Sequence, residues 1–154
     1  MTSLLAIDPG TTHSGIIRMD GRAVTFAGVM PNAEVLSIFP RNTADHIAIE
    51  MIASYGMAVG REVFETCVWI GRFVQAWHQD NDGEPRLIYR KDVKLHLCGS
   101  PRAKDANIRQ ALIDRWGGKA EAVGTVKKPG PLYGVKSHAW AALAVAVTAM
   151  ETKP

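Results

Sequence analysis

The sequence predicts an α/β fold, a five-stranded mixed sheet flanked by helices, and two observations carry this prediction. Three apolar stretches open the chain, and Asp20-Gly21 between the second and third is a strong hairpin signal, so the first three strands form an antiparallel meander. A fourth strand, a long helical pattern and a fifth strand follow, which is the order of parallel strands joined by a helix. We expect one domain over residues 1–154, because no repeat, low-complexity segment or long linker interrupts the chain.

The strands are predicted from short runs of apolar and β-branched residues. The first run, LLAI, leads directly into Asp8, and the fourth run, HIAIE, ends at Glu50. A short helix or connecting turn is expected at 33–39, ended by Pro40. The expected strands are 4–7, 15–19, 23–29, 46–50 and 86–89.

The helices are predicted from apolar spacing and stop signals. The stretch 61–78 has helical spacing and is apolar over more than one face, which favours a subunit interface as well as core; its apolar positions are 63, 64, 67, 70, 74 and 77. Ser137 is a plausible N-cap for the last helix. The other expected segments are one or two helical turns at 92–97, a helix at 103–116, a loop at 127–131 and an apolar helix at 137–150.

The charge distribution suggests a polyanionic partner. The formal net charge is only +3, but residues 84–136 hold 12 Lys or Arg against 5 Asp or Glu. Such an asymmetry is typical of nucleic-acid-binding proteins, although a solvated basic face gives the same pattern.

The remaining composition indicates a cytoplasmic protein of a bacterium or a phage-infected cell. Cys67 and Cys98 lie in apolar stretches with no Cys/His spacing for zinc, which favours reduced core thiols. Asp8 interrupts a short N-terminal apolar run, so no signal peptide is expected. The longest apolar run, 139–147, is too short to span a bilayer, so we expect no membrane association.

Asp8 and Glu50 are the candidate metal ligands. If the first and fourth strands are adjacent and parallel, both carboxylates emerge at the sheet edge where ligands bind in open α/β sheets. Two carboxylates at one point repel each other, and a cation such as Mg²⁺ relieves that repulsion. His138 is a candidate third ligand, which Mn²⁺ tolerates better. Asp8 as a cap of the amides at 10–12, Glu50 as a surface acid and His138 as an ordinary helix-start residue remain open alternatives.

Four blocks of the sequence resemble the RuvC family of Holliday-junction resolvases. They are LLAIDPGTTHSG, IAIE followed by an amphipathic helix, DVKLHLCGSPRAKDANIRQALI and HAWAALAVAV, and their order and spacing fit the family over most of the chain. The divergence outside the blocks resembles phage or prophage members. The resemblance implies an RNase H-like fold and a homodimer, here through helix 61–78. It also implies cleavage of four-way DNA junctions by paired nicks, with Mg²⁺ as cofactor and Mn²⁺ as its substitute.

The resemblance further implies a catalytic set with one departure. Family catalytic positions fall on Asp8, Glu50, His138 and Ala141, and alanine cannot bind a metal. The chain is then a three-ligand variant, an enzyme with a replacement acid, or a protein that has lost activity. Two acids on the helix after the fourth strand are the first to check as replacements, Glu62 and Glu65.

The resemblance also implies DNA contacts. Lys94 and Lys104 match family lysines near the scissile phosphate, and Lys104 is expected to assist catalysis. Where the family often has an aromatic wedge this chain has Ala53, with Tyr55 as a candidate for stacking on an opened base. The other expected contacts are Arg90, Lys91 and Arg102.

Three other functions remain open. The IDPGTTHSG stretch also resembles the phosphate loop of the actin, hexokinase and heat-shock ATPase superfamily, but the chain lacks a second such motif and has room for one lobe. Another RNase H-like nuclease is the nearer alternative enzyme. A branched-DNA-binding protein without cleavage is consistent with Ala141. Binding to DNA should in every case be strongly salt-dependent.

Overall fold

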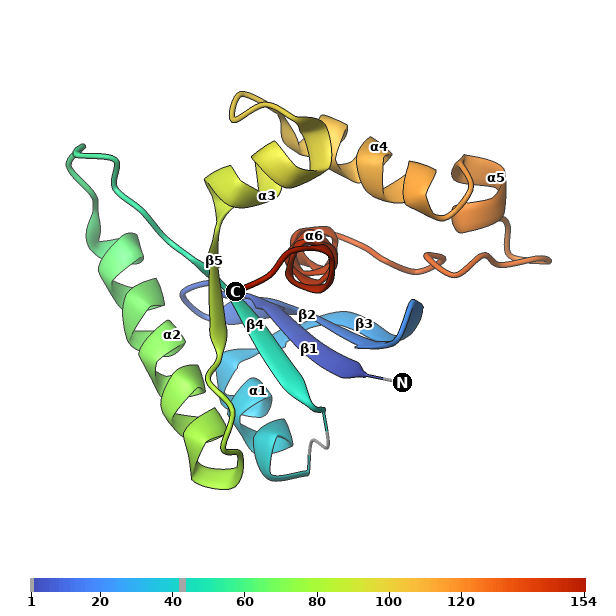
Figure 1. The fold of residues 1–154 in the computed structure, drawn as a ribbon. Helices are drawn as coiled ribbons and strands as arrows, with labels where there is room; N and C mark the ends of the chain where they lie inside the picture. Colours follow the sequence, from blue (N-terminus) through green and yellow to red (C-terminus); the bar gives the residue numbers. More distant parts are fainter. Residues whose placement is uncertain (1, 42–43) are drawn as a thin grey trace.

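The computed structural model describes residues 2–41 and 44–154, and within these ranges it contains a five-stranded sheet in the order β3-β2-β1-β4-β5 (Figure 1). The first three strands are antiparallel, whereas β4 and β5 run parallel to β1. The predicted mixed sheet is therefore confirmed. Its strands are β1 (Ser3–Asp8), β2 (His13–Asp20), β3 (Ala23–Pro31), β4 (His46–Met51) and β5 (Arg86–Tyr89).

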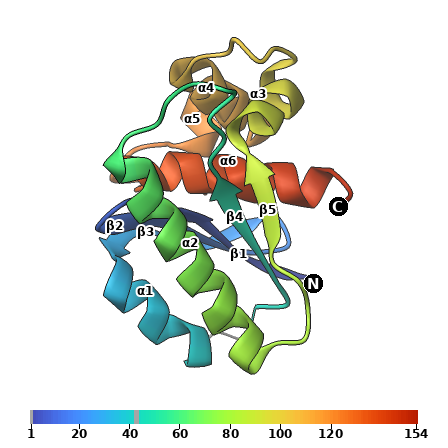
Figure 2. The same cartoon turned by 90° about the vertical axis from the view of Figure 1, so that its left-hand side faces the viewer.

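Helices cover both faces of the sheet. One face carries α1 (Asn32–Ile38), the short 3₁₀ turn η1 (Phe39–Arg41) and the long α2 (Arg61–Asp80), and the other carries α6 (His138–Glu151). Figure 2 shows β4 and β5 pointing toward α3 and α4, beyond the end of the sheet. The remaining helices are α3 (Arg90–Cys98), α4 (Asp105–Arg115) and α5 (Lys119–Ala122). Among the described residues, no helix has both the length and the apolarity needed to cross a membrane.

Each face of the sheet has its own apolar core because successive strand residues point to opposite sides. Leu5 and Ile7 of β1 join the core beneath α1 and α2. Leu4 and Ala6 join the core beneath α6, together with Ala48 of β4. The small side chains of Ala6 and Ala48 let the alanine-rich α6 lie close to the sheet. This alternation also decides where the carboxylates that follow β1 and β4 point.

The buried stripe of α2 differs from the predicted one. The residues of α2 that are buried are Thr66, Ile70, Phe73 and Trp77, whereas Phe64 is 63% exposed. The apolar spacing covered two faces of the helix, and packing on the sheet selected only one of them. The opposite face keeps Phe64 and Val68 exposed. This exposed face is therefore the part of α2 that could form the predicted subunit interface.

Several helix ends also differ from the sequence-based prediction. The helix expected at 92–97 begins at Arg90, directly after β5, and the helix expected at 103–116 begins at Asp105. The short α5 was not predicted, because four residues carry no periodic signal. Ser137 is the N-cap residue of α6, as predicted, but its side chain makes no capping bond and its φ of 52° is in the left-handed region. Both cysteines are free but only half-buried.

Candidate active site

The sheet brings Asp8 and Glu50 together. Strands β1 and β4 pair in parallel with Ile7 opposite Ile49, so the next residues along the two strands are Asp8 and Glu50. Because side chains alternate along each strand, Asp8 shares its face with Ala6, and Glu50 shares its face with Ala48. Both carboxylates therefore point to the α6 side of the sheet. Their side chains are largely buried, at 11% and 15% exposure, and share a hydrogen bond.

The first residue of α6 approaches the carboxylate pair. His138 Nδ1 lies 3.2 Å from Asp8 Oδ2, and the imidazole remains 67% exposed. Gly15 of β2 makes this approach possible, because a Cβ at that position would lie 2.2 Å from the His138 carbonyl oxygen. Ser137, immediately before the helix, adopts a φ of 52°, which costs energy in a residue other than glycine. The backbone is thus held in an uncommon conformation where the helix meets the site.

A buried polar network fixes the loop that follows Asp8. Ser14 donates a hydrogen bond to Asn32 Oδ1 at 2.6 Å, and the Asn32 amide donates to the Gly10 carbonyl at 2.9 Å. Ser14 and Asn32 are each 1% exposed. Buried polar groups are costly unless they are paired, so this pairing defines a single loop conformation. The alternative of Asp8 as a cap of its own loop is not favoured, because Ser14 and Asn32 hold this loop.

The surroundings of the carboxylate pair favour its protonated form. Burial raises the pKa of Glu50 to about 8, and the hydrogen bond to Asp8 and the Asp8 charge act in the same direction. Burial also raises the pKa of Asp8, against the lowering effects of the Glu50 hydrogen bond and the Arg90 charge. Two close carboxylates cannot both ionise cheaply away from water. A pair of this kind is a strong attractor for a cation.

Arg90 supplies one cation to the pair. Its Nη1 lies 3.4 Å from Glu50 Oε1, and its other terminal nitrogen contacts the Asp105 carboxylate. Arg90 is the first residue of α3 and Asp105 is the first residue of α4, so this bridge joins two helices to the end of β4. The Asp105 charge raises the pKa of Asp8, so Asp105 belongs electrostatically to the site. The sequence prediction assigned Arg90 only to DNA contact and did not include Asp105.

A cleft of about 490 Å³ opens beside the carboxylate pair, between α4 and the start of α6. Arginine side chains face it from two elements, α3 and α4, and Ala141 forms part of its wall. Its lining residues are Arg90, Asp105, Ala106, Ile108, Arg109, Ser137, His138, Trp140 and Ala141. A cleft with this lining favours an anionic and partly aromatic ligand. Arg109 and Trp140 were missed by the sequence prediction, because helix packing rather than a local motif brings them here.

The other predicted DNA contacts are not among the residues that line this cleft. Lys91 and Lys94 lie on α3, Arg102 and Lys104 lie between α3 and α4, and Tyr55 lies in the loop after β4. Tyr55 is 62% exposed with a φ of 52°. Within residues 2–41 and 44–154, Lys104 forms no ion pair with Asp8 or Glu50.

The two acids proposed as replacements for the missing ligand lie on α2. Glu65 forms an ion pair with Arg61 at 2.5 Å, and Glu62 is exposed. In the described part of the chain neither acid contacts Asp8 or Glu50. The acid that the structure brings to the site is Asp105.

The donor set fits a hard divalent cation at the carboxylate pair. Glu50 and Asp8 offer buried oxygen donors that repel each other when ionised, and His138 flanks Asp8 with a nitrogen donor. Across the described ranges, no three or more His, Cys, Asp or Glu side chains are arranged as a complete metal-binding group. The site is therefore an oxygen pair with a neighbouring imidazole, in which Arg90 currently balances the charge.

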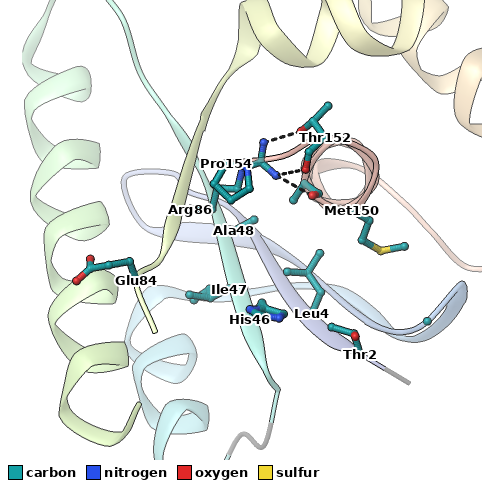
Figure 3. Close-up of a pocket in the computed structure, with 12 residues that line it drawn as sticks. Thr2, Leu4, His46, Ile47, Ala48, Glu84, Arg86, Met150, Thr152 and Pro154 are labelled. Atoms are coloured by element: carbon teal, nitrogen blue, oxygen red, sulfur yellow. Dashed lines mark hydrogen bonds between the residues drawn. The ribbon is translucent and has the colours of Figure 1, made fainter. Parts of the chain in front are cut away.

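A second cavity, of about 480 Å³, lies at the opposite end of the sheet. Figure 3 shows Arg86 of β5 reaching the last turn of α6 there. Arg86 donates to the carbonyl oxygens of Ala149, Thr152 and Lys153 at 2.7, 2.7 and 2.9 Å, and to Thr152 Oγ1 at 2.5 Å. These carbonyls have no partner within the helix, so Arg86 closes the end of α6. Arg86 therefore has a structural role in this cavity.

Comparison with solved structures gives one consistent result. RuvC from Thermus thermophilus matches with a TM-score of 0.69 at 18% identity, over 96% of this chain and 92% of that chain. T. thermophilus RuvC in complex with Holliday junction substrate matches with a TM-score of 0.66 at 20% identity, over the same shares. No protein-family model matches the sequence, and no curated protein matches it significantly. This chain has the RNase H-like fold of RuvC. A phage origin stays a prediction.

Proposed function

We propose that the protein is a metal-dependent endonuclease that cuts four-way DNA junctions by paired nicks. The observation that carries the proposal is the buried Asp8–Glu50 pair at the ends of two parallel strands, beside a cleft lined by Arg90, Arg109 and His138. Similarity to a RuvC structure described with Holliday junction substrate supports DNA as the ligand. The charge excess in residues 84–136 supports it independently.

In this proposal each residue of the pair has a chemical role. Asp8 and Glu50 would hold Mg²⁺, or Mn²⁺ in its place, and His138 would complete the set from the start of α6. Such a cation, when bound, would supply Lewis-acid chemistry toward water and the phosphate. Asp8, largely buried and fixed by its loop, orients the attacking water. Arg90, which lines the cleft, would offset the negative charge that develops on the phosphate, and we propose the same role for Lys104, which precedes α4.

DNA contacts in the proposal come from the helices above the sheet end. Arg90 on α3 lines the cleft, and the further contacts that we propose are Lys91 and Lys94 on the same helix and Arg102 and Lys104 before α4. Contacts of this kind position a phosphate backbone without reading its sequence. Tyr55 projects from the loop after Glu50, where an exposed ring can stack on an opened base.

We propose a homodimer through helix 61–78 for this function. One face of α2 packs on the sheet, while Phe64 and Val68, four residues apart, are each 63% exposed on another. A dimer covering these side chains would carry two sites, as paired nicks require. Sedimentation of the wild type and of Phe64→Glu at matched concentrations tests this, because a charge in the interface should yield monomer.

The alternative proposal is binding to branched DNA without cleavage, which Ala141 favours. Ala141 lies on α6 one turn beyond His138 and offers no oxygen donor to the site. Arg90 already balances part of the carboxylate charge, so the protein is not forced to take up a metal. An actin-type nucleotide site has no comparable support from the cleft, whose wall combines arginines with tryptophan.

A cleavage assay on a synthetic four-way junction distinguishes the two proposals. Duplex and flap DNA of the same sequence run beside it, in Mg²⁺ and then in Mn²⁺, with Asp8→Asn as the matched inactive control. Paired nicks that disappear in Asp8→Asn support the nuclease. Tight junction binding with no cutting in either metal supports the binding protein. Ala141→Asp then shows whether restoring one carboxylate restores cutting.

A further inference from the structure

The cleft beside His138 contains an arginine–tryptophan stack that the carboxylate chemistry does not use. The Arg109 guanidinium carbon lies 4.7 Å from the centre of the Trp140 ring. Arg109 is exposed and Trp140 is half-buried, and both line the cleft. Arg109 comes from α4 and Trp140 from α6, so the stack spans the two walls. It lies next to the residues that face the proposed scissile phosphate.

Its location distinguishes this stack from two similar pairs. Arg22 lies 5.5 Å from the Trp116 ring, and Arg72 lies 4.1 Å from the Trp69 ring. None of these four residues lines the cleft. Arg22 also donates to the Arg115 carbonyl oxygen, which gives that pair a structural use. The chain thus provides its own matched controls for the chemistry of an arginine on an indole.

The stack presents a flat cation to the cleft. One face of the Arg109 guanidinium is covered by the indole, which leaves the opposite face and its N–H edges for a ligand. In residues 2–41 and 44–154, Arg109 forms no salt bridge, whereas Arg90 in the same cleft is tied to Glu50 and Asp105. A guanidinium plane stacks on nucleobases, and tryptophan holds it in that orientation. The side chain therefore loses little freedom when a base binds.

The size of the cleft suits one nucleotide. Its volume of about 490 Å³ is within the ordinary range for small-ligand pockets. Ala141 and Ala106 contribute only methyl groups to its wall, so the space in front of Arg109 stays open. A longer side chain at 141 would enter that space. Ala141, which offers no metal donor, therefore also leaves room beside Arg109.

We propose that Arg109 and Trp140 form a nucleotide subsite, in which the base next to the scissile phosphate stacks on the Arg109 guanidinium while Arg90 contacts the phosphate. This inference rests on the proposed function, because it takes DNA as the ligand. Stacking accepts any base, so the subsite positions the strand without strict sequence preference.

Fluorescence anisotropy with a labelled four-way junction, in EDTA so that no cutting occurs, tests the subsite. Arg109→Lys keeps the charge but removes the plane, and Arg22→Lys makes the same change beside Trp116, outside the cleft and outside α2. We expect Arg109→Lys to weaken junction binding about tenfold, and Arg22→Lys to leave it unchanged. Trp140→Phe should retain most of the affinity, because phenylalanine still supports the guanidinium. Thermal unfolding of each variant in the same buffer confirms that it is folded.

An abasic scan identifies the base concerned. Each base around the crossover is removed in turn, and the loss of affinity is measured for the wild type and for Arg109→Lys. We expect one position at which removal weakens the wild type but not the variant, because both changes delete the same contact. Equal losses in both proteins at every position, or equal affinities for Arg109→Lys and Arg22→Lys, overturn the subsite. Failure of the wild type to bind any branched DNA instead overturns the proposed function.

Discussion

Replacing Glu50 by glutamine should stabilise the metal-free protein at alkaline pH. Burial beside Asp8 raises the pKa of Glu50 to about 8, from an ordinary value of 4.5. The folded state therefore holds this proton more tightly than the unfolded state does. The resulting stability is complete below pH 4.5 and is lost as the pH rises through about 8. Glutamine has the same shape but no charge to bury, so it avoids this loss.

The size of the effect follows from the pKa difference. Each pKa unit corresponds to about 1.4 kcal/mol, so a rise from 4.5 to about 8 corresponds to about 5 kcal/mol at most. The Glu50 side chain is only 15% exposed, so solvent screens little of this. A domain has a total unfolding free energy of about 5–15 kcal/mol. The loss is therefore a substantial fraction of the stability at alkaline pH.

Urea unfolding in EDTA measures this effect directly. The free energy of unfolding is determined for the wild type, Glu50→Gln and Glu62→Gln at about pH 5 and about pH 8.5, on either side of the titration. The free energy of unfolding of Glu50→Gln, relative to that of the wild type, should rise by several kcal/mol across this range. Glu62→Gln, which replaces an exposed carboxylate on α2, should show the same pH dependence as the wild type. A difference in unfolding free energy between Glu50→Gln and the wild type that stays constant with pH would show that Asp8 and Glu50 do not share a buried proton.

Four further changes should each disturb one contact. Gly15→Ala places a methyl group against the His138 carbonyl and should lower the free energy of unfolding by about 2 kcal/mol in urea unfolding. Asn32→Ala leaves Ser14 and a loop carbonyl unpaired, with a loss of about 2 kcal/mol in the same assay. Arg86→Ala should speed hydrogen exchange in the last turn of α6 without changing junction affinity. Saturating Mn²⁺ should raise the melting temperature of the wild type, and Asp8→Asn should lose most of that rise.

The position of the carboxylate pair could be predicted from the sequence because it depends on local rules. An apolar run that ends in Asp8 and another that ends in Glu50 specify two strands, and parallel pairing then puts both acids at one edge. Alternation along each strand fixes the face on which they emerge. The approach of His138 to Asp8 could not be predicted from strand pairing and alternation alone. It depends on Gly15, whose missing side chain lets the backbone of α6 come close.

The rest of the site depends on packing between helices, which leaves no pattern in the sequence. Asp105 follows Lys104 directly, yet the structure brings the acid and not the lysine to the site, through Arg90. Arg109 and Trp140 are 31 residues apart on two helices, and neither has a spacing that predicts contact. On α2 the apolar spacing correctly predicted a helix, but it could not say which face of that helix is buried. Sequence reasoning succeeded where the backbone alone decides, and it failed where side chains from separate elements meet.

Ala141 has two consequences, and these can be separated. Its methyl group offers no oxygen donor to the carboxylate site, and it adds little bulk to the cleft wall that it shares with Arg109 and Trp140. Aspartate at this position would add a donor near Asp8, and it would also put a carboxylate within the lining of the proposed base subsite. Cleavage by Ala141→Asp should then rise as junction affinity in EDTA falls. A protein that gained cutting with no loss of affinity would show that residue 141 concerns the metal alone.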